Sequence, residues 1–167
     1  MRVFVANLIL VCGLFSSILA DDSKDQSEKE MTGKVKKVID GDSLIVIDSD
    51  NKEQELQLEG IDAPEAKQAY GKDATKALDK LVAGKEVKVK WKSRDNFDRI
   101  LGHVYVGDQF VNLEMIKIGA AWHFKRYNKD EEFAKAEEKA REVKLGLWNE
   151  NEPVAPWDFR KNNKSKE

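Results

Sequence analysis

The chain has 167 residues, of which 41% are hydrophobic and 36% are charged, and its 29 basic and 31 acidic side chains give a net charge of −2. This balance suits one modest domain with charged ends, and it argues against a protein that holds long duplex DNA by a strongly basic surface. One cysteine and two histidines exclude a disulfide framework and a thiolate zinc site, so any bound metal would be a hard cation held mainly by oxygen atoms.

The first twenty residues have the pattern of an export signal. In MRVFVANLILVCGLFSSILA, Arg2 precedes an apolar run that stops at Ala20, before two aspartates. This pattern predicts a signal peptide over residues 1–20, and therefore a secreted or periplasmic protein. An uncleaved membrane anchor is the alternative, but the polar interruptions favour cleavage and no stable membrane association afterwards. Residues 21–32 are polar without periodicity and are predicted to be a disordered spacer.

The hydrophobic periodicity from residue 33 onward predicts three strands, a helix, two strands and two helices. In chain order these are strands at 34–39, 43–49 and 53–61, a helix at 73–84, strands at 85–92 and 99–106, and helices at 112–121 and 129–148. The last helix should turn Phe133, Ala136, Ala140 and Val143 inward.

A helix between the third and fourth of five strands is the layout of a small Greek-key barrel of the OB type. We therefore predict a mainly β fold with α (α+β), in which three helices pack on a five-stranded barrel over residues 33–149. An open α+β sheet would leave the same pattern. Residues 150–167 are predicted to be an extended tail with Trp157 docked on the domain.

Acidic side chains gather at two of the predicted loops. Asp40 and Asp42 flank a glycine in the first turn, and Asp62 and Glu65 follow the third strand in a segment that Pro64 stiffens. If neighbouring strands bring the two loops together, several carboxylates converge and need a cation or a proton. Either loop alone is more often a solvated turn, so the hypothesis of a cation site rests on the combination.

A cationic group and an aromatic segment complete the candidate site. Arg99 opens the fifth predicted strand, and its guanidinium would suit phosphate oxygens, although an ion pair with Asp95 or Asp98 is equally consistent with the pattern. The segment AWHFKRY (121–127) could stack on bases of a single strand, but such a segment is more often a packing seam.

Six segments of the chain resemble the thermonucleases, or staphylococcal nuclease-like (SNase-like) proteins, in order and spacing. They are VIDGDS (38–43), LEGIDAPE (58–65), AYGKDATKAL (69–78), DNFDRILGHVYV (95–106), VNLEMIKIGAAWHFKRY (111–127) and AEEKAREVKLGLW (136–148). The resemblance implies an OB-fold endonuclease, usually Ca2+-dependent, that hydrolyses phosphodiester bonds of DNA and/or RNA with little sequence preference. We expect a monomer that prefers single-stranded or frayed nucleic acid.

The resemblance also implies roles for individual residues. Asp42 and Asp62 match metal ligands of the family, and Ala63 matches a position that binds the metal through its backbone carbonyl. Glu65 matches the catalytic carboxylate that positions or activates the attacking water, and Arg99 matches an arginine that stabilises the phosphoryl charge. These roles fit the chemistry, because attack on a phosphodiester gathers negative charge that a cation and a guanidinium can stabilise.

Gln57 departs from the family pattern. The family has a second phosphate-binding arginine at this position, whereas here a neutral amide stands between Leu56 and Leu58, which should turn inward and leave Gln57 on the outer face. Two functions are therefore open. The chain is either a working nuclease or a nuclease-derived OB-fold module that binds nucleic acid or nucleotide with little or no cleavage.

Overall fold

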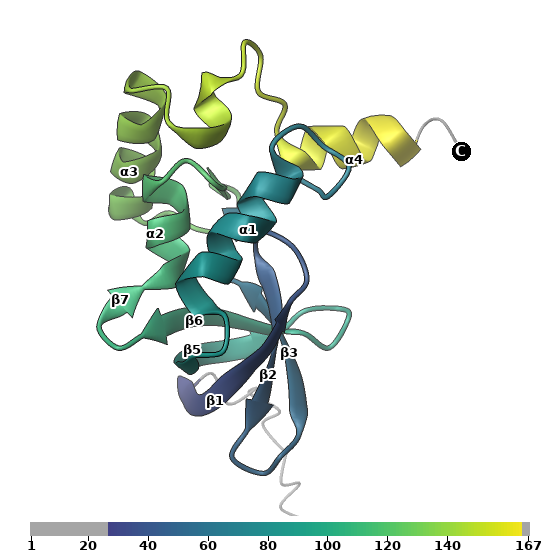
Figure 1. Cartoon of the computed structure of the whole chain (residues 1–167), viewed down its shortest axis with the longest axis vertical. Coiled ribbons are helices and arrows are strands. Elements are labelled where there is room, and N and C mark those ends of the chain that lie inside the picture. The colour runs from purple at the N-terminus through teal and green to yellow at the C-terminus, as the bar shows by residue number, and fades with distance from the viewer. Residues whose placement is uncertain (1–26, 165–167) are drawn as a thin grey trace, which may run out of the picture.

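The computed structural model describes residues 27–164, in which strands form a barrel and the helices gather above it in the view of Figure 1. The predicted signal peptide, the first part of the predicted spacer and residues 165–167 lie outside the described residues. Within the described part of the chain, no helix combines the length and the apolar character needed to cross a membrane.

The elements follow the predicted order, with three very short strands, a 3₁₀ turn and a fourth helix added. The strands are β1 Lys29–Val38, β2 Ser43–Asp48, β3 Glu53–Leu58, β4 Ile61–Asp62, β5 Glu86–Arg94, β6 Ile100–Val106, β7 Gln109–Phe110 and β8 Trp122–His123. The helices are α1 Gly71–Val82, α2 Val111–Lys117, α3 Glu131–Glu142, the 3₁₀ helix η1 Gly146–Asn149 and α4 Pro156–Lys164.

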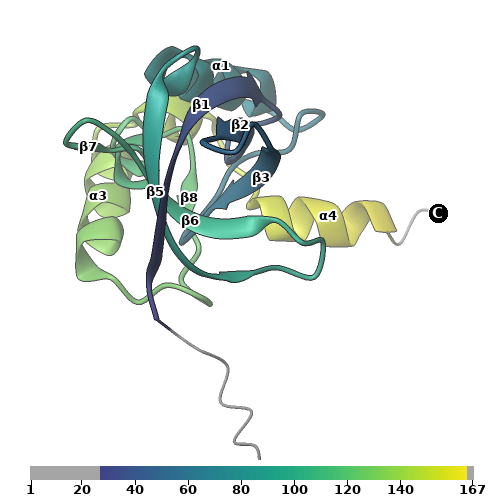
Figure 2. The ribbon, with the colours of Figure 1, turned by 90° about the horizontal axis from the view of Figure 1, so that it is seen from below.

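Five long strands close into the barrel. Strands β1, β2 and β3 form an antiparallel meander, β1 also pairs with β5, and β5 pairs with β6. The parallel pairing of β3 with β6, in which Leu56 lies opposite Ile100, closes the sheet on itself (Figure 2). This closure confirms the predicted α+β fold with an OB-type barrel and rules out the open sheet.

The barrel interior is filled by alternate residues of the strands and by one face of α1. Leu56 and Leu58 are buried on either side of half-buried Gln57, as the alternation predicted. Ala74 and Leu78, which are fully buried, place α1 against the barrel. Because a one-residue slip of β3 would expose both leucines, the register of β3 is fixed, and with it the place where Asp62 follows.

Several boundaries differ from the prediction: the third strand ends at Leu58 and the second helix at Lys117, and two further differences have a clear physical cause. Strand β1 begins at Lys29, inside the predicted spacer, because β5 extends far enough to pair Lys29 with Trp91. The predicted helix over 129–148 ends at Glu142, since Lys144 and Gly146 adopt positive φ angles of 51° and 60° that a helix cannot continue through. Val143 is consequently 63% exposed instead of facing inward.

The C-terminal segment corrects the prediction of an extended tail. Residues Pro156–Lys164 form helix α4, which is the yellow helix at the upper right of Figure 1. Pro156 starts the helix, where its missing N–H costs nothing and its fixed φ angle suits the first turn. The predicted docking of Trp157 is observed, because its ring stacks on Phe124 with centroids 5.4 Å apart.

Candidate functional site

The turn between β1 and β2 places Asp42 against the segment that follows β3. A carboxylate oxygen of Asp40 accepts the Asp42 N–H at 3.1 Å, which holds the turn in shape. A Cβ on Gly41 would lie 2.6 Å from Cβ of Ala63 and 2.8 Å from Cβ of Ala74, so only glycine allows this close approach. The turn therefore packs directly on Ala63 and on α1.

Asp42 and Asp62 are both buried carboxylates, with 7% and 5% of their surface exposed. Oδ2 of Asp42 accepts the Ala63 N–H at 2.7 Å. Burial raises the pKa of Asp42 well above its ordinary value, and the charges of Asp40 and Asp62 raise it further, while a hydrogen bond from the Gln57 side chain lowers it. The structure thus brings the two predicted acidic loops together and buries Asp42 and Asp62.

A tight loop carries Glu65 into the same site. The Glu65 carbonyl accepts the Gln68 N–H at 2.8 Å, and a Cβ on Gly71 would lie only 1.9 Å from that carbonyl oxygen. Glycine is therefore required where the loop enters α1. The Glu65 side chain is 37% exposed, so its carboxylate is open to water beside buried Asp62.

Arg160 of α4 binds both carboxylates, and the sequence prediction missed it. Its Nη1 donates to Oδ1 of Asp62 at 3.0 Å and to Oε1 of Glu65 at 2.7 Å, and its Nη2 donates to Oδ2 of Asp62 at 2.6 Å. Burial raises the pKa of Asp62, and the Arg160 guanidinium lowers it without cancelling the rise. The one local signal for α4 was Pro156 followed by Asp158 in the first turn, a common start of a helix.

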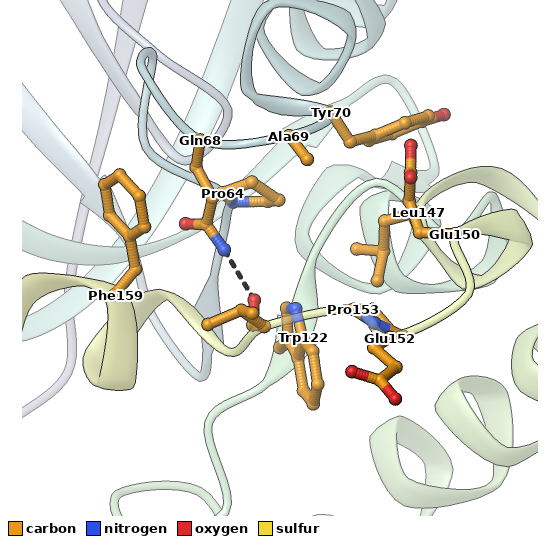
Figure 3. A pocket seen from close by; sticks show the side chains of 11 residues that line it. Pro64, Gln68, Ala69, Tyr70, Trp122, Leu147, Glu150, Glu152, Pro153 and Phe159 are labelled. Carbon is orange, nitrogen blue, oxygen red and sulfur yellow. Dashed lines mark hydrogen bonds between the residues drawn. The ribbon is translucent and has the colours of Figure 1, made fainter. Parts of the chain in front are cut away.

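Contacts along the C-terminal segment fix the position of α4. Trp157 packs edge-on against Trp122, with ring centroids 5.5 Å apart, and Gln68 donates its amide N–H to the carbonyl of Val154 (Figure 3). A cavity of about 250 Å³ lies between this segment and the loop that carries Glu65, and Pro64 and Phe159 are among its lining residues. The site carboxylates do not line this cavity, so we regard it as a gap beside the site.

Arg99 lies on the loop before β6, and its guanidinium binds Asp95 rather than the site carboxylates. Its Nε is 2.8 Å and its Nη2 is 2.7 Å from Oδ2 of Asp95, which is the ion pair that the sequence left open. Phe97, in the same loop, is 81% exposed and lies under the Arg99 guanidinium at 5.6 Å. The loop thus presents a cation and an aromatic ring to solvent.

The aromatic segment that could have stacked on bases is mostly a packing seam. Trp122 and His123 are buried, and they pair with Asp62 and Ile61 in the β4–β8 ladder. Their packing therefore helps to hold Asp62 in place. Tyr127 differs from these two, because it is 69% exposed with the Arg126 guanidinium 5.5 Å from its ring.

The chemistry of the donor set fits a hard cation. Asp42 and Asp62 offer carboxylate oxygens, the Ala63 carbonyl offers a third oxygen, and the burial that raises both aspartate pKa values is what a bound cation would offset. Within residues 27–164, no group of three or more His, Cys, Asp or Glu side chains is arranged to hold a metal. Water or substrate oxygens would have to supply the remaining ligands.

Comparison with known proteins gives consistent matches. Residues 55–150 match the family model described as staphylococcal nuclease homologue. A protein of Escherichia coli, described as an uncharacterized endonuclease, is 44% identical over 132 residues, which cover 78% of this chain and 86% of that protein. A Haemophilus influenzae protein with the same description is 35% identical over 163 residues, covering 98% of this chain and 87% of that protein. A staphylococcal-like nuclease of Arabidopsis thaliana is 44% identical over 107 residues, which cover 64% of this chain and 33% of the plant protein.

Proposed function

We propose a detailed activity from one established premise: the chain belongs to the staphylococcal nuclease homologue family, a family of nucleases. The proposed activity is Ca2+-dependent hydrolysis of phosphodiester bonds in DNA and/or RNA, with little sequence preference. The observation that carries the proposal is the convergence of buried Asp42 and Asp62 with half-exposed Glu65. A carboxylate open to water beside two buried carboxylates is an arrangement that a hydrolytic site needs and a protein core does not.

The residues divide the work of hydrolysis. A water molecule attacks phosphorus while Glu65 accepts its proton, one P–O ester bond breaks, and the leaving oxygen takes up a proton from solvent. Asp42, Asp62 and the Ala63 carbonyl would hold the cation, which supplies positive charge against the phosphoryl oxygens when bound. Arg99, on the exposed loop before β6, contributes further positive charge once the phosphate competes with Asp95 for its guanidinium.

Substrate contacts are proposed from the exposed surface. Phe97 beside Arg99 and Tyr127 beside Arg126 each present an aromatic ring with a cation, which suits unpaired bases and their phosphates. Such contacts favour single-stranded or frayed nucleic acid over intact duplex. We also propose that the protein is exported, on the basis of the N-terminal signal pattern, and that it acts as a monomer. Mass spectrometry of the exported protein should find Asp21 as its first residue, and an intact N-terminus would contradict export by this route.

A cleavage assay tests the proposed function. Purified residues 21–167 are incubated with labelled single-stranded DNA and RNA, in a titration of calcium and in excess chelator. We expect cleavage that rises with calcium and stops in chelator. Binding of the labelled strands without cleavage, even at high protein concentration, would overturn the proposal in favour of a binding module.

A further inference from the structure

The site must bind an anion although it is rich in carboxylates. The charge of Asp40 raises the pKa of both Asp42 and Asp62, the charge of Asp62 raises that of Asp42, and the Glu65 charge raises the pKa of Asp62 as well. A phosphodiester carries a negative charge of its own, and its charge on the phosphoryl oxygens grows during attack. Gln57 adds no charge, and its amide hydrogen-bonds to Asp42. One divalent cation, together with an Arg99 that is paired with Asp95, therefore leaves the phosphate short of positive partners.

Arg160 is placed to supply the missing positive charge to the phosphate. Its guanidinium lies 2.7 Å from Glu65, and a general base lies about one water molecule from the reacting phosphorus. Three of its five N–H groups bind Asp62 and Glu65, whereas the Nε–H and the second N–H of Nη2 have no partner within the described part of the chain. The side chain is 42% exposed, so a ligand can reach it from solvent.

We propose that Arg160 is a phosphate-binding catalytic residue of this site, which uses its free N–H groups to contact phosphoryl oxygens and so replaces the guanidinium that Gln57 does not provide. This inference rests on the proposed nuclease function. Helix α4 is then part of the active site, although it is separated from β4 by more than ninety residues of chain. The pair with Glu65 orients the guanidinium before the substrate arrives, which reduces the cost of ordering it later.

The same contacts also let Arg160 compete with the cation for the Asp62 carboxylate. Competition and phosphate binding predict opposite effects of removing Arg160 on the cleavage rate. If Arg160 only occupied the carboxylates, its removal would tighten calcium binding and leave the rate at saturating calcium unchanged or higher. If Arg160 binds phosphate, its removal lowers that rate and weakens the binding of a phosphate ligand. Measurements at saturating calcium therefore separate the two roles.

The experiment compares residues 21–167 carrying Arg160→Gln, Arg160→Lys or Lys135→Gln. Lys135 is an exposed cation on α3 that pairs with Glu131, so its replacement controls for the loss of one positive charge. At saturating calcium, we expect kcat/KM to fall about a hundredfold for Arg160→Gln and less for Arg160→Lys, which keeps the charge but loses the planar fork. Lys135→Gln should cleave at the wild-type rate.

A binding measurement accompanies the rates. Thymidine 5′-monophosphate contains no phosphodiester bond, so calorimetry with it in saturating calcium reports phosphate binding without turnover. We expect its Kd to rise about tenfold in Arg160→Gln and to stay unchanged in Lys135→Gln. An unchanged or lower Kd in Arg160→Gln would overturn the inference. If wild-type protein binds the nucleotide but does not cleave, the proposed function fails while the role of Arg160 is still tested.

A double variant tests whether Arg160 does the work missing at position 57. In the wild-type background Gln57→Arg should change kcat/KM by less than about threefold, because Arg160 already contacts the phosphate. In the Arg160→Gln background, Gln57→Arg should recover at least about tenfold of the lost rate. Circular dichroism and intrinsic tryptophan fluorescence, to which Trp157 contributes, would report whether α4 stays folded and docked. Equal effects of Gln57→Arg in the two backgrounds would contradict the replacement.

Discussion

Glu65 is the residue whose chemistry the proposed mechanism needs most directly. Glu65→Gln keeps the size and the hydrogen-bonding ability of the side chain but cannot accept the proton of the attacking water. We expect kcat at saturating calcium to fall about a hundred- to ten-thousandfold. The measurement is single-turnover cleavage of labelled single-stranded DNA.

Glu59→Gln is the matched control for Glu65→Gln. Glu59 lies in the turn between β3 and β4, and its carboxylate faces His103 at 3.8 Å instead of the site. This variant should cleave at the wild-type rate. A Glu65→Gln protein with a rate within about threefold of wild type would remove Glu65 from the role of general base.

At the residue level, the sequence predicted the positions of side chains whose signal was local, whereas their catalytic and metal-binding roles stay predictions. Asp42, Asp62 and Glu65 stand at strand ends, and the alternation of Leu56 and Leu58 fixed the direction of Gln57, so these positions followed from pattern and family resemblance. The sequence did not predict whether the Arg99 guanidinium pairs with Asp95 or with phosphate. Asp95 lies four residues away, and nothing in the sequence favours it over phosphate. Arg160 was missed because its contacts to Asp62 span 98 residues and leave no local pattern.

Among the elements, α2 is tied to the barrel by one buried amide. Asn112 accepts the Val104 N–H at 2.9 Å, and its Nδ2 donates to the carbonyls of Glu59 at 2.9 Å and Gly102 at 3.0 Å. Asn112→Ala would leave the Val104 N–H and the Glu59 carbonyl without this partner, whereas the Gly102 carbonyl keeps its hydrogen bond from the Glu59 N–H, and we expect a loss of about 3 kcal/mol in the free energy of unfolding. Chemical denaturation followed by circular dichroism measures it.

Two further variants sharpen the prediction for Asn112. Asn112→Asp keeps an acceptor for Val104 but loses both donors, so it should also destabilise the fold. Lys117→Ala changes an exposed residue of the same helix and should alter the stability by less than about 0.5 kcal/mol. Equal stabilities of Asn112→Ala and Lys117→Ala would show that α2 does not depend on the amide.

The elements themselves were largely predictable, and their ends were not. Strands and helices with a clear apolar period, such as β2 and α1, appear where the pattern placed them, because burial of one face decides their structure. Helix α3 ends before the predicted residue 148, because the chain adopts positive φ angles that hydrophobic periodicity cannot predict. Helix α4 has a weak apolar face, and the prolines at 153 and 156 favoured an extended interpretation, although proline is also common in the first turn of a helix.

At the scale of the whole molecule, closure of the barrel decides where the site forms. The parallel pairing of β3 with β6 sets the end of β3 beside the start of β6, and the antiparallel pairing of β2 with β3 places Ser43, next to Asp42, opposite Gln57. The order of elements predicted such a barrel, but an open sheet has the same order, so only the β3–β6 pairing separates the two. Long-range pairing of this kind carries no signal in a single strand.

The buried carboxylates should make the metal-free protein lose stability as the pH rises. The pKa of Asp42 is raised by burial first and then by the charges of Asp40 and Asp62, so the folded state binds its proton more tightly than the unfolded state. Stability from that proton is fully present below the unfolded-state pKa, near 3.8, and is lost as the pH rises through the folded-state pKa.

Asp42→Asn has no such proton to lose. In excess chelator, the free energy of unfolding of wild type relative to Asp42→Asn should therefore fall as the pH rises above the unfolded-state pKa, as measured by urea denaturation at each pH. Saturating calcium should raise the stability of wild type at pH 7 more than that of the variant, because only wild type keeps both carboxylate ligands. A pH-independent difference between the two proteins in chelator would mean that Asp42 is not a buried, proton-binding group in the folded state.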